Sequence, residues 1–189
     1  MEERIMIAGF GGQGVMAIGQ ILTYAGMIED KNVSWLPSYG PEMRGGTANC
    51  GVIISNEPVG SPVVVNSTSA IIMNKPSLDK FEKFVNKGGK LFVNSSLIEA
   101  KSERDDIDVY YIPANEIANE LGNSRVANMV MLGAYLEATK AIGMKSIEEG
   151  FVKVFGEERA HLLPINKEAL KKGGEFVREQ KKFLETKSY

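Results

Sequence analysis

A glycine-rich hexapeptide near the start of the chain has the composition of an anion-binding turn. Residues 9–14 read GFGGQG, which satisfies the pattern G-x-G-x-x-G, and they stand between a short apolar run and apolar residues at helical spacing. Glycines permit a tight reversal, and the free N–H groups at the start of the following helix favour a bound anion. The turn therefore predicts contact with a phosphate or pyrophosphate. Its candidate binding residues are Gly9, Gly11, Gly12, Gln13 and Gly14.

The residues that follow narrow the identity of that ligand. A nicotinamide dinucleotide requires an acidic residue about 20 positions further on, where it holds the ribose hydroxyls. Residues 35–38 (WLPS) end the second predicted strand without an acid, and Glu29 and Asp30 fit a surface turn before it. The pattern therefore disfavours a dinucleotide and leaves two interpretations open: a phosphate of another ligand, and a structural turn that binds nothing.

A second loop, residues 38–46 (SYGPEMRGG), carries polar side chains on a backbone rich in Gly and Pro. The guanidinium of Arg44 suits a carboxylate or phosphate, and Glu42 is placed to hold it. The alternative is an exposed Glu42–Arg44 ion pair of little energetic weight. The candidate site residues of this loop are Tyr39, Glu42 and Arg44.

Metal and nucleophile chemistry find little support in the sequence. Cys50 is the single cysteine and His161 the single histidine, so this chain has too few ligands for an iron–sulfur cluster or a multi-histidine metal site. Cys50 stands beside Gly51 in a predicted strand and is interpreted as a small buried hydrophobe. We expect no catalytic residue and no metal ligand in this chain.

Composition and charge describe a globular protein. The net charge of −2 disfavours nucleic-acid and membrane partners, and the first residues lack the positive region of a secretory signal, so we expect a cytoplasmic protein. The first 60 residues hold only 9 of the 46 charged residues. Charge depletion of this kind is typical of core strands or of an interface centre.

Short apolar runs alternate with helical periodicities along the chain. This alternation predicts an α/β fold, a Rossmann-like three-layer domain with a mainly parallel sheet and C-terminal helices. We expect a single domain over 1–189, with 146–189 as a helical C-terminal segment. The predicted strands are 4–8, 32–36, 47–55, 70–73, 91–93 and 109–111, and the predicted helices are 15–28, 78–85, 115–121, 127–142, 147–155 and 167–184.

Two expectations concern how these elements assemble. Strands 5–8 and 33–36 are expected to be neighbours, which would place the two glycine loops side by side at the carboxyl edge of the sheet. Helix 15–28 is apolar nearly all round, with Met16 and Tyr24 opposite Val15. Since a sheet covers only one side of a helix, a partner chain or a homodimer is expected to cover the rest.

The two glycine loops, together with residues 7–8 and 52–55, resemble the gamma subunit of the 2-oxoacid:ferredoxin oxidoreductases. These enzymes oxidatively decarboxylate 2-oxoacids to acyl-coenzyme A. The form of the second loop is similar to that of the 2-oxoglutarate and branched-chain (ketoisovalerate) members. The resemblance covers nearly the whole chain and extends through residues 74–79, 88–94, 128–133 and 166–174.

The resemblance implies a non-catalytic subunit. In this family the holoenzyme uses thiamine diphosphate, magnesium, iron–sulfur clusters and coenzyme A, and this chain lacks the Gly-Asp-Gly pattern of a thiamine diphosphate site. The implied partners are alpha and beta subunits, a delta ferredoxin-like subunit and, through the complex, ferredoxin. The two loops would contact coenzyme A or dock the other subunits. Branched-chain or pyruvate specificity, a freestanding nucleotide-binding enzyme and a plain interaction domain are the alternatives.

Overall fold

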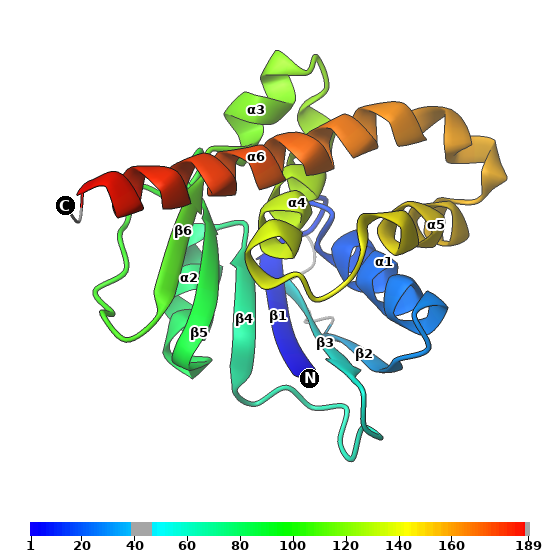
Figure 1. Cartoon of the computed structure of the whole chain (residues 1–189), viewed down its shortest axis with the longest axis horizontal. Coiled ribbons are helices and arrows are strands. Elements are labelled where there is room, and N and C mark those ends of the chain that lie inside the picture. The colour runs from blue at the N-terminus through cyan, green and yellow to red at the C-terminus, as the bar shows by residue number, and fades with distance from the viewer. Residues whose placement is uncertain (39–46, 188–189) are drawn as a thin grey trace.

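A computed structural model describes residues 1–38 and 47–187, with side chains through residue 182. Within them, six strands form one sheet in the order β2-β3-β1-β4-β5-β6 (Figure 1). The strand pairs β1–β4, β4–β5 and β5–β6 are parallel, whereas β3 is antiparallel to both β1 and β2. The predicted α/β class with a mainly parallel sheet is confirmed. The strands are β1 (Glu2–Phe10), β2 (Asn32–Ser38), β3 (Thr47–Ser55), β4 (Ser67–Ile72), β5 (Val85–Asn94) and β6 (Asp108–Ile112).

The expected adjacency of β1 and β2 is wrong, because β3 is hydrogen-bonded between them. Since β3 is antiparallel to both neighbours, β1 and β2 still run in the same direction and end at the same edge. Phe10 at the end of β1 pairs with Thr47, and Ser38 at the end of β2 pairs with Asn49. The expected shared edge therefore holds for the residues that flank the second loop, with one strand between them.

Two predicted boundaries are also wrong. The predicted second strand ends at residue 36, yet β2 continues through Pro37 to Ser38. An edge strand has one unpaired side, so it tolerates a residue without an N–H group. The fifth strand was predicted over 91–93, but β5 begins at Val85 and includes Gly88 and Gly89, with a φ of 74° at Gly88. Glycine accommodates this left-handed conformation, and the strand continues beyond it.

Helices cover both faces of the sheet (Figure 1). On one face α1 and α4 pack on side chains such as Ile7, Ile71 and Phe92. On the other face α2 packs on Ala70 and Ile72. The helices are α1 (Val15–Ile28), α2 (Lys75–Phe81), α3 (Ala114–Glu120), α4 (Ala127–Thr139), α5 (Met144–Phe155) and α6 (Leu163–Lys187).

The second side of α1 is covered by α5 of the same chain, which corrects the expectation that a partner must cover it. Gly150 of α5 lies against the carbonyl of Ile21, so close that a Cβ there would lie 2.9 Å from that oxygen. Ile21 is fully buried as a result. The remaining exposed apolar surface of α1 is confined to its C-terminal half, where Tyr24 is 41% and Met27 55% exposed.

Helices α4 and α6 cross backbone to backbone. A Cβ on Gly133 would overlap the carbonyl of Leu170, and a Cβ on Gly173 would overlap the carbonyl of Val130. These two glycines let α6 lie directly on α4, whose residues from Ala127 to Leu136 are all buried. The next residue of α6, Gly174, is different, because its nearest neighbour would be the Cβ of Glu137 at an ordinary 3.5 Å.

This difference between adjacent glycines predicts opposite effects of one substitution. Gly173→Ala should lower the free energy of unfolding by about 2–4 kcal/mol, because the added methyl forces the helices apart. Gly174→Ala should raise it by up to about 1 kcal/mol, because alanine is the better helix former. Urea unfolding followed by circular dichroism measures both. Equal effects at the two positions would contradict the close crossing.

Candidate functional site

The glycine turn joins the end of β1 to the start of α1 and needs glycine at two positions. Gly12 and Gly14 take φ values of 89° and 76°, in the left-handed region. A Cβ on Gly14 would also overlap the side-chain amide of Asn128. No side chain caps the start of α1, and its first turn holds no acidic residue. The N–H groups of this turn and the helix dipole therefore favour an anion.

Gln13 holds the turn in place. Its Oε1 accepts a hydrogen bond from the N–H of Phe10 at 2.6 Å, and its Nε2 donates to the carbonyl of Met73 at 3.2 Å. The side chain thereby ties the turn to the chain segment that follows β4. Gln13 was predicted as a ligand-binding residue, and the structure gives its amide two partners within the protein. Its role in binding stays a prediction.

A pocket of about 250 Å³, which we call the glycine pocket, opens beside the turn at the carboxyl edge of the sheet. The start of α4 and the 3-10 turn Ser124–Val126 form its other wall. Arg125 is exposed, and its guanidinium has no hydrogen-bond or ion-pair partner among the residues that the structure describes. The pocket therefore combines a helix N-terminus with one available cation. Its lining residues are Gly12, Gln13, Met73, Asn115, Ser124, Arg125, Ala127 and Asn128.

Asparagine side chains position the wall opposite the turn. Asn94, at the end of β5, donates to Asn115 Oδ1 at 2.8 Å. The hydroxyl of Ser96 accepts the N–H of Asn115 at 3.1 Å. Asn128 accepts the N–H of Met129 through Oδ1 and donates to the carbonyl of Gly14 at 3.4 Å. The first two bonds tie α3 to the end of β5, and the bond from Asn128 to Gly14 ties α4 to the glycine turn.

The structure brings part of the predicted site together. Gly12 and Gln13 line the pocket, Gly11 and Gly14 belong to the same turn, and Gly9 lies in β1 just before the turn. The predicted residues Tyr39, Glu42 and Arg44 lie outside the described residues. The ends of their loop, Ser38 and Thr47, lie at the same sheet edge as Phe10.

Sequence reasoning missed the residues of the far wall. Arg125 and Asn128 follow the turn by more than a hundred positions, and only the fold brings them to it. The sequence contained one signal for this wall: the family resemblance extends through residues 128–133, but it assigned no role to them. The chemistry of the pocket is recognition of an anion. Among residues 1–38 and 47–182, no three His, Cys, Asp or Glu side chains form a cluster that suits a metal ion.

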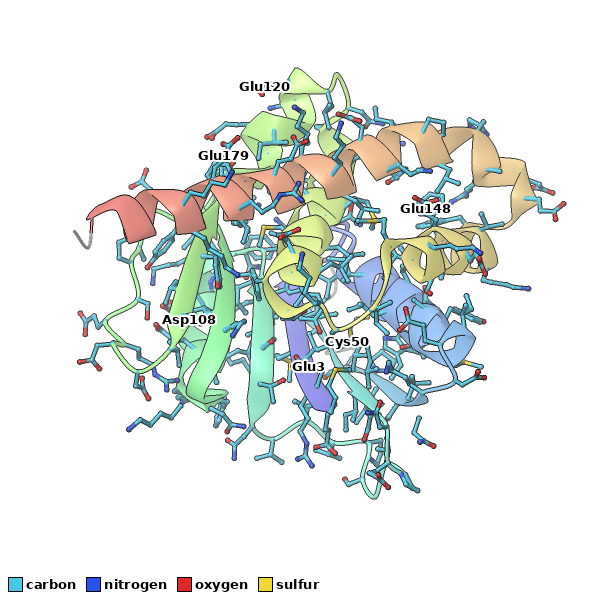
Figure 2. The ribbon with its side chains drawn as sticks, in the orientation of Figure 1. Glu3, Cys50, Asp108, Glu120, Glu148 and Glu179 are labelled. Atoms are coloured by element: carbon cyan, nitrogen blue, oxygen red, sulfur yellow. The ribbon has the colours of Figure 1, made fainter. Side chains whose placement is uncertain are left out.

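Cys50 is enclosed between the sheet and α1 (Figure 2). Its thiol donates a weak 3.8 Å hydrogen bond to the carbonyl of Val15 and lies over Gly19 beside Trp35. Burial raises the pKa of the Cys50 thiol to about 12, and the Trp35 indole opposes this in part. The prediction of a small buried hydrophobe is confirmed. His161 is exposed in the 3-10 segment Glu157–Leu162, where its Nδ1 lies 3.0 Å from the carbonyl of Glu158.

The Cys50 thiol should resist modification in the folded protein. At about pH 8 a disulfide reagent should label the chain only after unfolding, because the thiolate is the reactive form. The folded pKa of the thiol lies above the ordinary 9.0. Its contribution to the free energy of unfolding is therefore fully present below pH 9.0 and is lost as the pH rises towards 12. Thiol titration with and without guanidinium checks the first point. Labelling at equal rates in both states would contradict it.

The sheet order, the helices on both faces and the glycine turn at the carboxyl edge define a Rossmann-like α/β domain. Residues 4–176 match the family described as pyruvate ferredoxin/flavodoxin oxidoreductase. The chain belongs to this family, which confirms the resemblance drawn from the two glycine loops.

Two relatives and one solved structure place the chain within the family. Ketoisovalerate oxidoreductase subunit VorA of Methanothermobacter marburgensis is 39% identical over 181 residues, which are 94% of this chain and 37% of VorA. The 2-oxoglutarate synthase subunit KorC of Methanocaldococcus jannaschii is 34% identical over 88% of this chain and 92% of KorC. The gamma subunit of a keto/oxoacid ferredoxin oxidoreductase from Geobacter sulfurreducens superposes with a TM-score of 0.78 at 28% identity, covering 94% of this chain and 99% of that one.

The relatives differ in length. The chain spans 37% of the length of VorA but nearly all of KorC and of the Geobacter subunit. The same fold therefore exists both as a separate chain and as part of a longer one. Within the described part of the chain, none of the helices has the length and apolarity needed to cross a bilayer.

Proposed function

We propose that this chain is the gamma-type subunit of a 2-oxoacid:ferredoxin oxidoreductase, with 2-oxoglutarate as the expected substrate and a branched-chain 2-oxoacid as the alternative. The carrying observation is its match to KorC over nearly the full length of both chains. VorA, a ketoisovalerate subunit with higher identity, supports the alternative substrate. The reaction converts the 2-oxoacid to acyl-coenzyme A and passes electrons to ferredoxin.

The chemical steps belong to other subunits in this proposal. An iron–sulfur cluster requires several cysteine ligands, and this chain has only the buried Cys50. The glycine pocket offers neutral amides and one guanidinium, which does not suit magnesium, a cation that prefers oxygen ligands including carboxylates. Thiamine diphosphate, magnesium and the clusters would therefore lie on the alpha, beta and delta chains.

The glycine pocket is the proposed contribution of this chain. Coenzyme A carries several phosphates, and the N–H groups of Gly11 and Gly12, the start of α1 and Arg125 offer donors to one of them. Arg44 belongs to the loop whose ends lie at the same edge, and it would add a second cation. The alternative role of this edge is docking of the alpha and beta subunits without contact to coenzyme A.

Reconstitution tests the proposed function. The purified chain should show no oxidation of 2-oxoglutarate with a viologen acceptor, and activity should appear only when alpha and beta subunits are added. A complex assembled without this chain is the control. Acyl-coenzyme A formation by this chain alone would contradict the proposal, as would full activity of the control. Binding of NAD by the isolated chain in calorimetry would favour the freestanding nucleotide enzyme.

Substitutions separate the two roles of the glycine pocket. Arg125→Ala and Arg44→Ala should each raise the apparent KM for coenzyme A about ten- to a hundred-fold, the effect of one charge-assisted hydrogen bond. Arg159→Ala removes a guanidinium from the exposed Glu157–Leu162 segment and should leave the KM unchanged. If Arg125→Ala and Arg44→Ala assemble normally with an unchanged KM, the edge serves docking alone.

A further inference from the structure

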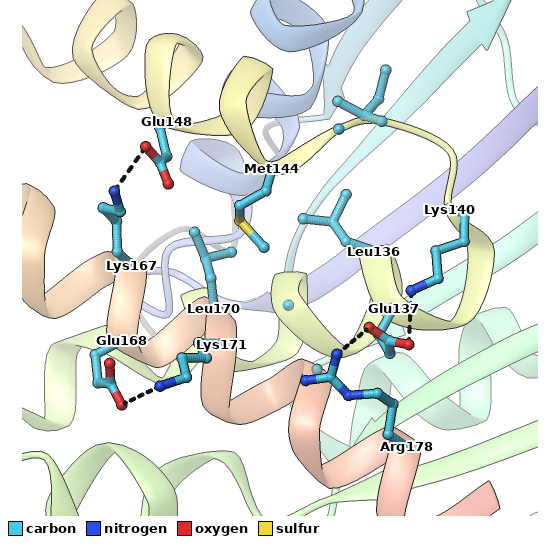
Figure 3. Close-up of a pocket in the computed structure, with 14 residues that line it drawn as sticks. Leu136, Glu137, Lys140, Met144, Glu148, Lys167, Glu168, Leu170, Lys171 and Arg178 are labelled. Atoms are coloured by element: carbon cyan, nitrogen blue, oxygen red, sulfur yellow. Dashed lines mark ion pairs between the residues drawn. The ribbon is translucent and has the colours of Figure 1, made fainter.

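A second cavity lies at the other end of α4. The glycine pocket is at Asn128, whereas this cavity reaches Lys140, about 18 Å further along the helix rise. It has a volume of about 580 Å³ and lies between α4, the start of α5 and the part of α6 from Lys167 to Arg178 (Figure 3). This volume is within the range of small-molecule sites.

The floor of this cavity is aliphatic. Leu136 of α4, Ile142 before α5 and Leu170 of α6 line it, and Met144 stands at its margin with 41% of its surface exposed. None of the described residues that line the cavity is aromatic. The floor therefore suits a flexible hydrocarbon body rather than a planar ring.

Gly174 keeps the cavity open. A glycine inside a helix costs about 1 kcal/mol relative to alanine, and such a cost usually has a packing reason. Gly133 and Gly173 have that reason in the helix crossing, but a Cβ on Gly174 would meet its neighbours at 3.5 Å or more. Gly174 lines the cavity, so a side chain at this position would fill part of the cavity.

Charged side chains surround the rim of this cavity. Its lining holds four cations, Lys140, Lys167, Lys171 and Arg178, and three carboxylates, Glu137, Glu148 and Glu168. Glu137 is shared, because Lys140 lies 2.7 Å from one of its oxygens and Arg178 lies 3.4 Å from the other. Lys171 approaches Glu168 and Glu175 only to 3.9 Å. Arg178 and Lys171, seven residues apart on the same side of α6, have capacity for a further carboxylate.

We propose that this cavity binds an aliphatic carboxylate, with its hydrocarbon body on Leu136, Ile142 and Leu170 and its carboxylate between Lys171 and Arg178. The chemistry is that of a medium-chain organic acid. The site is separate from the glycine pocket and does not rest on the function proposed above.

Octanoate is the probe that tests the proposal. Two control probes each lack one of its two features, the carboxylate or the hydrocarbon chain. Octylammonium keeps the hydrocarbon body and reverses the charge, and acetate keeps the charge and lacks the body. Titrations of the full chain, followed by NMR of the Leu136 and Leu170 methyl groups, should give saturable binding for octanoate alone. Equal shifts with octylammonium or acetate, or the absence of saturation with octanoate, would overturn the proposal.

Variants locate the binding. Gly174→Leu should abolish octanoate binding by filling the cavity, whereas Gly174→Ala adds one methyl and should retain it. Arg178→Gln should weaken binding by about tenfold or more. Lys153→Gln, an exposed lysine of α5 away from the cavity, is the matched control and should bind as the parent does. Unchanged octanoate binding in folded Gly174→Leu and Arg178→Gln proteins would place the ligand elsewhere.

Discussion

The backbone contact of α4 with α6 is the constraint on which the helical layer depends. Glycines at 133 and 173 remove the side chains that would separate the two helices, and α4 becomes buried over ten consecutive residues. Protein interiors are close-packed, so a helix enclosed in this way has little freedom to shift. Both ends of α4 are thereby fixed, one beside the glycine turn and the other beside the aliphatic cavity. The two pockets share a rigid element.

Much of the architecture was accessible from the sequence, because short apolar runs and glycine-rich turns alternate along it. All six strands were expected near their observed positions. The direction of β3 was not, since the run from Thr47 to Ser55 specifies a buried strand without specifying its partner. The cover of α1 by α5 was missed for a similar reason. An apolar helix indicates that something must cover it, and only the tertiary fold decides whether the same chain does so.

The candidate site also has one part that the sequence predicts and another that only the fold assembles. The glycine turn is a local feature, and its strand–turn–helix context was legible from consecutive residues. Arg125 and Asn128 belong to a segment with no pattern of its own, and their placement depends on how α4 returns across the sheet. Gln13 shows a different limit of sequence-based prediction, because a residue predicted to contact a ligand has a structural role. Its polar side chain beside a phosphate-type turn indicated a ligand contact, and the fold uses that side chain to tie the turn to Met73.

The two outer strands bear on how the chain behaves before it meets a partner. At β2, Pro37 supplies no N–H group, and at β6, Gln180 of α6 donates a 3.2 Å hydrogen bond to the carbonyl of Tyr111. Both margins of the sheet thus discourage the addition of a further strand, a common route to aggregation for exposed sheets. These two features disfavour polymerisation through backbone pairing at the margins of the sheet. Contacts with other chains would then be made through side chains, which recognise a particular partner, whereas backbone strand pairing does not depend on side-chain identity.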